Sequence, residues 1–365
     1  MSNRLEPAFS NHASAQDALL EDISAWKIAV SRLPGVTRIG KENQRLFSEL
    51  LSSENDADSY LTSSAYYAFT GRNGLWVYQE GASFIPFCWH PNVPGEILVF
   101  PARGSYSASI LHNFLQTIPE PPCGLRLARV KGGSFVMEET SPMATKLGQS
   151  VVFAPVIEHV LDWKYPVRVL STDLVSKMEG PNFRHVRNHI RQILLKNPEI
   201  RNLRDVPSTL LDRFIVEWAG NAATTVYEIS DLVNLYRTIM SLSDDPALNV
   251  EGLVVLINGR VEALNMWDVS NPNNPTANRF VNLCNTAYSG LADFVMNRTA
   301  KCLFAQGIKY LNIGGAETES LDRFKRKFMP AYSIGLHSVE VEFQSFNDMN
   351  GAAYNLDRSA VECSN

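Results

Sequence analysis

Apolar and polar positions alternate in a way that predicts a β-hairpin in the second half of the chain. Residues 254–257 form an apolar run rich in β-branched side chains, and Asn258 and Gly259 follow them. Asn-Gly between two apolar runs is the strongest short hairpin signal. We therefore expect a second strand over residues 260–267. A third strand over residues 279–283 leads through a short turn into an apolar-periodic helix.

The same pattern occurs earlier in the chain. The segment GLWVYQEGASFIPFCW, which begins at Gly74, aligns without a gap to GLVVLINGRVEALNMW, which begins at Gly252. After each hairpin an apolar run and a Tyr-Ser pair, at Tyr106 and at Tyr288, lead into a helical pattern. We infer two copies of one α/β module in tandem. The alternative is two unrelated hairpins with common turn chemistry.

The positions of loops and polar stretches divide the chain. We expect a loose arm over residues 1–20, a first domain over residues 21–150, a second domain over residues 151–345 and a polar tail over residues 346–365.

One predicted helix concentrates positive charge. The segment GPNFRHVRNHIRQILLKNP has apolar residues at helical spacing on one face. Its opposite face carries Arg184, Arg187, Asn188 and Arg191.

The chain has 365 residues, which suits about two domains. Of these residues 45% are hydrophobic and 19% are charged, a composition typical of a globular protein. No apolar run approaches the ~18 residues of a membrane span, and the first residues lack the pattern of a signal peptide. The five cysteines form no CxxC pair, which is typical of reduced thiols. We therefore expect a cytoplasmic protein. Because the net charge is −5, any contact with RNA requires a local basic patch.

Three segments resemble the C-terminal catalytic region of phosphatidylglycerol lysyltransferases, a tandem-GNAT family that moves amino acids from aminoacyl-tRNA to an amine or hydroxyl acceptor. They are GPNFRHVRNHI, the Tyr-Ser-Gly turn, and YLNIGGAETESLDRFKRKFMPAY, which is also similar to the FKxxF element of Fem-type peptidyl transferases. The matching residues are Arg187, Asn188, Tyr288, Ser289, Gly290, Asn312, Leu321, Lys325 and Pro330.

The resemblance implies a mixed α/β (α+β) fold of two tandem GNAT domains and an aminoacyltransferase that uses aminoacyl-tRNA as co-substrate. The chain departs from the family before the Tyr-Ser-Gly turn, where the family usually has E-K-x-D. Here the residues are Asn282, Leu283, Cys284 and Asn285, so both carboxylates are amides. We also expect no counterpart of the membrane-embedded half of the lipid-modifying members. We therefore expect a soluble metabolite or peptide as acceptor.

Aminolysis of an aminoacyl ester requires that the amine and the carbonyl are held together. It also requires donors for the oxyanion and an acceptor for the amine proton. The candidate donors are backbone N–H groups at Tyr288, Ser289 and Gly290, with the side chains of Asn282 and Asn285. The alternative is that the turn only caps a helix.

Glu317 is the first candidate proton acceptor and Asp268 is the second; the alternative is that both are solvated loop carboxylates. Arg187 and Lys325 are candidates for holding a phosphate or an acidic group, and a structural role for Arg187 with Asn188 is equally open. The expected substrate-binding or tRNA-binding residues are Arg184, Arg187, Asn188, Arg191, Asn285, Gly290, Asn312, Arg323 and Lys325.

Other chemistries lack their motifs. His185 and His189 have the spacing of metal ligands on a helix, but no third ligand is evident, so we expect no metal. No P-loop, GxSxG elbow or dinucleotide fingerprint is present, and an acetyl-CoA signature is missing from both repeats. We expect no bound cofactor. The alternatives to aminoacyl transfer are an acyl-CoA-dependent N-acyltransferase and a non-catalytic GNAT-fold binding protein. The oligomeric state is left open.

Overall fold

The computed structural model describes residues 10–54, 56–104, 107–131, 143–144, 149–156, 165–222, 229–269, 271, 273–316 and 318–345. The chain divides into two compact units. The first comprises Met1–Ile39, Thr70–Asp162 and His337–Asn365, and the second comprises Gly40–Phe69 and Trp163–Leu336.

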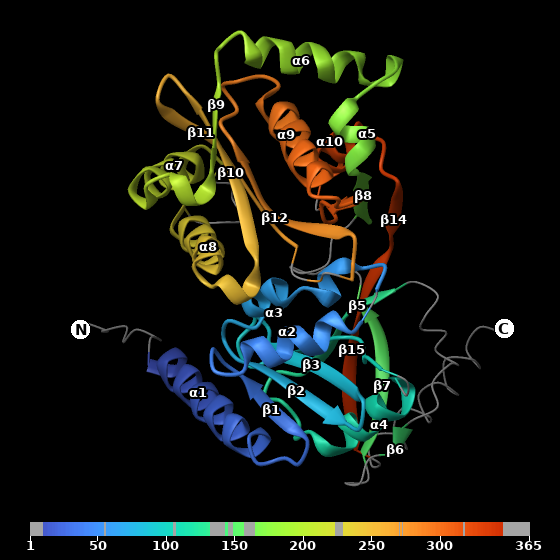
Figure 1. Ribbon diagram of the computed structural model, residues 1–365. Coiled ribbons are helices and arrows are strands. Elements are labelled where there is room, and N and C mark those ends of the chain that lie inside the picture. Colours follow the sequence, from blue (N-terminus) through green and yellow to red (C-terminus); the bar gives the residue numbers. More distant parts are fainter. Residues whose placement is uncertain are drawn as a thin grey trace, which may run out of the picture. The chain divides into compact units, whose positions relative to one another are not determined.

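The first unit contains an eight-stranded mixed sheet (Figure 1). Its core includes three indole rings, because Trp26 of the first helix lies against Trp76 and Trp89 of the sheet. The strands, in sheet order, are β1 (Val36–Ile39), β2 (Leu75–Glu80), β3 (Ser83–Trp89), β4 (Ile97–Val99), β5 (Leu125–Lys131), β15 (Leu336–Ser345), β7 (Gln149–Val156) and β6 (Met143–Ala144). The helices are α1 (Ser10–Val30) and α4 (Ser107–Thr117).

The second unit contains a seven-stranded mixed sheet. The strands, in sheet order, are β14 (Tyr332–Ile334), β8 (Val167–Ser171), β13 (Tyr310–Asn312), β12 (Thr276–Cys284), β11 (Arg260–Asp268), β10 (Val250–Ile257) and β9 (Glu199–Asn202). The helices and 3₁₀ turns are α2 (Gln44–Ser52), η1 (Ser59–Thr62), α3 (Ser64–Thr70), α5 (Thr172–Lys177), η2 (Pro181–Phe183), α6 (Arg184–Leu194), η3 (Leu203–Asp205), α7 (Ser208–Ala222), α8 (Ile229–Ser241), η4 (Leu242–Asp244), η5 (Pro246–Leu248), α9 (Leu291–Ala305) and α10 (Glu319–Arg326).

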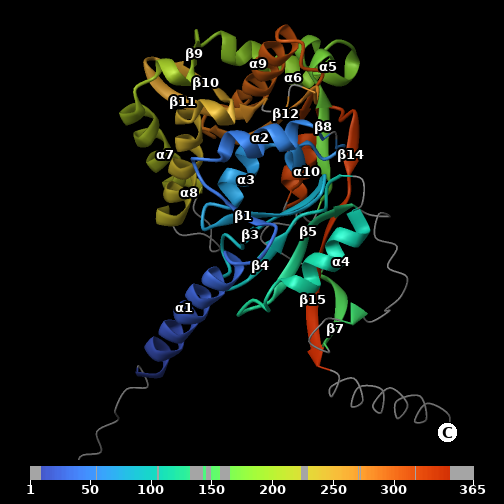
Figure 2. The ribbon, with the colours of Figure 1, turned by 60° about the horizontal axis from the view of Figure 1, so that its bottom comes forward.

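Two hydrophobic clusters cover the two faces of this second sheet. Helices α7 and α8, which pack side by side in Figure 2, cover one face, and α5, α6 and α9 cover the other. Alternate residues of β10 divide between the clusters: Val254 and Leu256 face α7 and α8, whereas Val255 and Ile257 face α9. This is the period-two burial of a strand with both faces covered.

The predicted hairpin is confirmed. Asn258 and Gly259 have φ angles of 52° and 76°, the left-handed conformation that a two-residue type I′ turn needs at both positions. The same order of hairpin, third strand, helix and parallel strand occurs twice, as β2-β3-β4-α4-β5 and as β10-β11-β12-α9-β13. The tandem repeat inferred from the sequence is therefore present in the fold.

Each compact unit is built from separate stretches of the chain, so the units differ from the contiguous domains expected from the sequence. The last strand, β15, pairs with β7 in the first sheet, while β8 lies between β13 and β14 in the second. Residues 40–69, expected in the first domain, lie in the second unit. The apolar pattern of a strand predicts its existence but not the sheet that it joins, because its hydrogen-bond partners are distant in sequence. Residues 10–20, expected to be a loose arm, belong to α1; residues 1–9 and the tail from 346 lie outside the described residues.

Candidate active site

The second sheet opens between two parallel strands at its centre. β12 and β13 pair only from Thr276 to Asn278, opposite Tyr310 to Asn312. β13 then ends, whereas β12 continues to Cys284. Beyond this point β12 has no neighbour on that side among the described strands. Ligand sites in α/β sheets lie preferentially where neighbouring strands separate at their carboxyl ends.

A buried polar network lies where the strands separate. Ser63 Oγ donates a hydrogen bond to one carboxylate oxygen of Asp268, and Asn278 Nδ2 donates to the other over 2.9 Å. Ser59 Oγ donates to Asn278 Oδ1 and accepts from Asn312 Nδ2 over 3.1 Å. Asp268, the second candidate proton acceptor, is fully buried, and both its oxygens accept hydrogen bonds. This network would have to break before Asp268 accepted a substrate proton.

Arg279 is the first β12 residue beyond the paired segment. It is buried, and its guanidinium contacts the Met296 sulfur, 3.6 Å from Nη1. Burial lowers the pKa of its guanidinium from 12.5 to about 10. No carboxylate pairs with it among the described residues, so Arg279 brings an uncompensated positive charge to the opening of the sheet.

The turn between β12 and α9 is held by Asn285. Its Oδ1 accepts from the Ala287 N–H over 3.0 Å, and its carbonyl accepts from the Tyr288 N–H over 3.2 Å. Within the described part of the chain, the N–H groups of Ser289 and Gly290 have no acceptor. They are therefore free to donate to a ligand, as an oxyanion site requires.

Asn282 lies on the α9 face of β12. Its Oδ1 accepts from Asn265 Nδ2 over 3.0 Å, and Thr299 of α9 donates to Asn265 Oδ1 over 3.3 Å. These bonds fix the orientation of the Asn282 amide. Its NH₂ group has no acceptor among the residues that the structure describes.

The N-terminus of α9 is covered by α6. Gly290 has φ +86°, and a Cβ atom there would lie 2.6 Å from the Cβ of His189. In the first turn of α9, one carboxylate oxygen of Asp293 lies 2.8 Å from His189 Nδ1 and the other pairs with the Lys327 ammonium. A helix N-terminus favours an anion, but here that position already holds the protein's own carboxylate.

The charged face of α6 divides between two roles. Arg187 is turned inward, and its Nη1 donates to the carbonyl oxygens of Met178 over 2.6 Å and of Gly180 over 2.7 Å. Arg184, Asn188 and Arg191 are exposed. The two arginines have no carboxylate partner among the described residues.

The glycine loop after β13 contains the remaining site residues. Lys325 of α10 is buried, and its ammonium donates to the carbonyl oxygens of Gly314, over 3.2 Å, and of Gly315. Asn312 Oδ1 accepts from the Gly314 N–H over 2.9 Å. Lys325 and Asn312 therefore hold the backbone of this loop. Glu317, the first candidate proton acceptor, follows in the same loop and lies outside the described residues.

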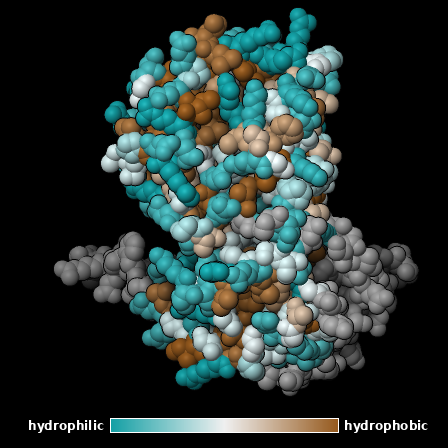
Figure 3. Space-filling model, viewed as in Figure 1, coloured by the Kyte–Doolittle hydropathy of each residue, from teal (hydrophilic) through white to brown (hydrophobic). Residues whose placement is uncertain are grey.

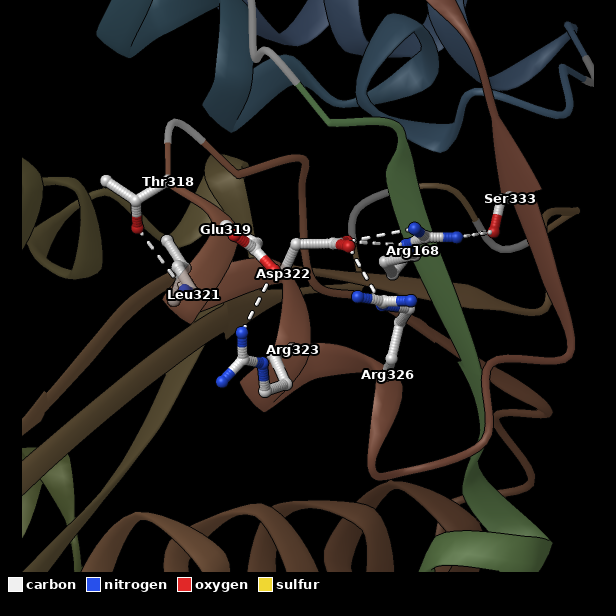
Figure 4. A network of polar contacts seen from close by, with 8 residues as sticks. All are labelled: Arg168, Thr318, Glu319, Leu321, Asp322, Arg323, Arg326 and Ser333. Carbon is white, nitrogen blue, oxygen red and sulfur yellow. Dashed lines mark hydrogen bonds and ion pairs between the residues drawn. The ribbon is translucent and has the colours of Figure 1, made fainter.

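Helix α10 is anchored by a second charged network (Figure 4). The buried Asp322 carboxylate accepts from Arg168 Nε over 3.0 Å and pairs with Arg326 over 2.9 Å. Arg323, a candidate tRNA-binding residue, is exposed and pairs with Glu319 over 2.9 Å. These contacts fix α10 beside the glycine loop.

Two side chains of this region were missed by the sequence analysis. His189, considered there only as a metal ligand and then set aside, pairs with Asp293. Glu262 is buried and binds Asn285, with Asn285 Nδ2 donating to Glu262 Oε2 over 2.7 Å. The sequence signal that could have identified Glu262 is its position as a lone carboxylate within the apolar run of the second hairpin strand.

Together, two tandem α/β units that repeat the order of hairpin, strand, helix and parallel strand define a GNAT-like fold. A conserved protein of unknown function from Bacteroides thetaiotaomicron VPI-5482 superposes with a TM-score of 0.62 at 13% identity, covering 85% of this chain and 100% of that one. The C-terminal domain of a putative lysylphosphatidylglycerol synthetase from Agrobacterium fabrum gives 0.52 at 13% identity, covering 88% and 96%. FemX gives 0.53 at 11% identity, covering 84% and 96%.

At these identities the similarity is one of fold. No protein-family model matches the sequence, and no curated protein matches it. Within the described residues, no helix is both long enough and apolar enough to cross a membrane.

Proposed function

We propose that this chain is a GNAT-fold aminoacyltransferase that moves an aminoacyl group from aminoacyl-tRNA to an amine or hydroxyl acceptor on a soluble metabolite or peptide. The nitrogen or oxygen of the acceptor attacks the ester carbonyl and forms a bond to the carbonyl carbon. The bond between that carbon and the tRNA 3′-end oxygen then breaks. The acceptor's proton is transferred, and the tRNA leaves with a free hydroxyl. Because the ester is already activated, positioning and oxyanion stabilisation supply most of the acceleration.

The observation that carries the proposal is the covered N-terminus of α9. An acyl-CoA donor brings a pyrophosphate, which binds best at exposed N–H groups of a helix N-terminus. Here α6 lies directly on Gly290, and Asp293 places a carboxylate in the first turn. Both features disfavour a bulky pyrophosphate, whereas an aminoacyl ester needs only one carbonyl oxygen to reach the free N–H groups of Ser289 and Gly290. They support aminoacyl-tRNA over acyl-CoA as donor.

The exposed face of α6 supports the same choice. The net charge of the chain is negative, so a tRNA needs a local cationic surface. Arg184 and Arg191 provide one, since both are exposed and have no carboxylate partner among the described residues. Along the upper edge of the molecule in Figure 3, where α6 lies in Figure 1, hydrophilic side chains lie among hydrophobic ones.

Some residues of the site are assigned to contact the substrate, and others to hold those residues in position. We assign the free N–H groups of Ser289 and Gly290 to the oxyanion, with the Asn282 NH₂ as a further donor. Glu317 remains our candidate proton acceptor. Asp268 is assigned a positioning role, because its two oxygens already accept from Ser63 and Asn278.

The proposal is tested by incubating the full chain with a mixture of charged tRNAs and a panel of soluble amines, and following amide formation. We expect product that depends on the protein and disappears after RNase treatment. Product formed equally well from acetyl-CoA in RNase-treated samples would overturn the tRNA assignment. No turnover of either donor would overturn the aminoacyltransferase assignment.

The proton acceptor is tested with Glu317→Gln, which we expect to lower turnover at saturating donor about 100-fold or more, the usual contribution of a general base. Glu319→Gln is the matched control, since Glu319 is exposed and paired with Arg323. Equal turnover in the two variants would remove Glu317 from the mechanism.

A further inference from the structure

A cavity of about 130 Å³ lies at the ends of β11 and β12, on the face covered by α7. Its wall combines two aromatic rings with carboxylates and a thiol. The residues that form it include Phe214, Glu217, Trp218, Glu262, Cys284 and Asn285. For comparison, an engineered cavity of about 150 Å³ in another protein holds benzene. This cavity therefore has room for a group of about six heavy atoms.

A β-bulge places Glu262 in this wall. Val255 of β10 lies opposite Ala263, and the next residue, Leu256, lies opposite Val261. Glu262 is therefore the extra residue that has no partner across the hairpin. A bulge re-aims the side chain of its extra residue, and here it places a carboxylate among apolar residues on the α7 side of the sheet.

The Glu262 carboxylate is only half satisfied. The residue is 4% exposed, and its Oε2 accepts from Asn285 Nδ2 over 2.7 Å. Its second oxygen has no donor within the described part of the chain. This second oxygen is not sealed from solvent, so a cation in the cavity can reach it and pair with it.

Among the described residues that line the cavity, no cation pairs with Glu262. The other carboxylate there, Glu217, lies 2.9 Å from Arg213 and 3.0 Å from Arg260, so its charge is already balanced. The indole of Trp218 forms another part of the wall, and aromatic faces attract cations. Trp218 is itself held by an edge contact with Tyr236, with ring centroids 5.3 Å apart.

We propose that this cavity is a binding site for a primary ammonium group carried on a short apolar arm, with Glu262 as its counter-charge. Asn285 fixes the carboxylate so that its free oxygen faces the cavity. Phe214 and Trp218 contact the apolar arm. The inference concerns binding, and it stands whether or not aminoacyl transfer is the reaction.

The test measures binding of n-butylammonium to the full chain by calorimetry and ligand-observed NMR. Butanol and butyrate serve as uncharged and anionic probes of similar size. We expect butylammonium to bind and butyrate not to bind. Glu262→Gln keeps an acceptor for Asn285 but removes the charge, and it should weaken butylammonium binding about tenfold or more. Urea unfolding checks that the variant is folded.

Glu217→Gln is the matched control, because it removes a carboxylate from the same wall whose charge is already paired. It should change the affinity less than threefold. Equal losses in the two variants would mean that the cavity responds only to overall charge, and would overturn the assignment to Glu262. Butanol binding as tightly as butylammonium, or no binding of butylammonium at all, would overturn the proposal itself.

Discussion

Arg187 donates a hydrogen bond from Nη1 to the carbonyl oxygen of Met178 over 2.6 Å. Met178 has a left-handed backbone with φ 49°, which is unfavourable for a residue with a side chain. The same nitrogen reaches the Gly180 carbonyl over 2.7 Å. Arg187 therefore closes the loop between α5 and α6, which is the structural role that the sequence left open beside a ligand-binding one.

We predict that Arg187→Ala lowers the free energy of unfolding by about 2–4 kcal/mol, since it removes a charged donor from two carbonyl groups. Arg184→Ala is the control one turn earlier on α6, where the side chain is exposed, and it should change stability by no more than about 0.5 kcal/mol. Urea unfolding measures both. Equal stabilities would mean that Arg187 does not hold the loop.

Gly290 makes a second test of how α6 and α9 pack. Gly290→Ala places a Cβ 2.6 Å from that of His189 and requires a residue with a side chain to keep φ +86°. We predict a loss of about 2–4 kcal/mol from overlap and backbone strain together. Gly220→Ala, in α7 with open space around it, should instead gain about 0.5–1 kcal/mol. A tolerated alanine at 290 would mean that α6 does not lie on the turn.

The buried carboxylate in Figure 4 allows a comparison within one helix. Asp322 is 2% exposed and pairs with Arg168 and Arg326. We predict that Asp322→Asn destabilises the protein by about 3–5 kcal/mol, because it leaves guanidinium groups without their counter-charge. Glu319→Gln, which removes the exposed partner of Arg323, should cost no more than about 1 kcal/mol. Thermal and urea unfolding distinguish the two.

The repeated hairpin could be read from the sequence because its determinants are local. Asn258 and Gly259 adopt the turn that their backbone preferences favour, and alternate residues of β10 enter the two cores as the apolar pattern requires. The destination of β15 had no such signal. Its pattern is that of any strand, and its partner β7 is almost two hundred residues away along the chain.

The candidate site was predictable only as a list of polar positions. Helical spacing places Arg187 on the polar face, but whether its guanidinium meets a ligand or the Met178 carbonyl depends on how the preceding loop folds. Glu262 was missed because a bulge shifts the inward and outward alternation of β11 by one residue. Such a shift leaves no trace in the spacing of apolar residues.

Cys284 gives the chain a predicted dependence of stability on pH. Burial raises the pKa of its thiol from 9.0 to about 12, with Arg279 opposing the shift. In the unfolded chain the thiol ionises near 9.0, whereas the native state keeps the proton to higher pH. Unfolding therefore releases a proton above pH 9, and stability falls by about 1.4 kcal/mol per pH unit from this group.

In Cys284→Ala the free energy of unfolding should therefore fall less steeply with pH, by about 1.4 kcal/mol per pH unit, which corresponds to one proton. Urea unfolding between pH 9 and 11 with a reducing agent measures this slope. The buried Cys88, whose pKa burial also raises, contributes in the same direction and remains in the variant. Cys123→Ala replaces an exposed thiol and is the control. An unchanged slope in Cys284→Ala would show that this thiol ionises equally in both states.

The exposed charges of α6 should set the affinity for tRNA. Arg184→Glu with Arg191→Glu is predicted to weaken tRNA binding at least tenfold at low salt. It should also reduce the slope of log affinity against log salt by about 1.5, because two phosphate contacts are lost. Filter binding over a salt series measures both quantities. Arg45→Glu with Arg213→Glu changes the net charge equally, but at arginines that pair with carboxylates of their own helices. If both double variants lose the same affinity and slope, the effect is one of total charge, and α6 is not the tRNA surface.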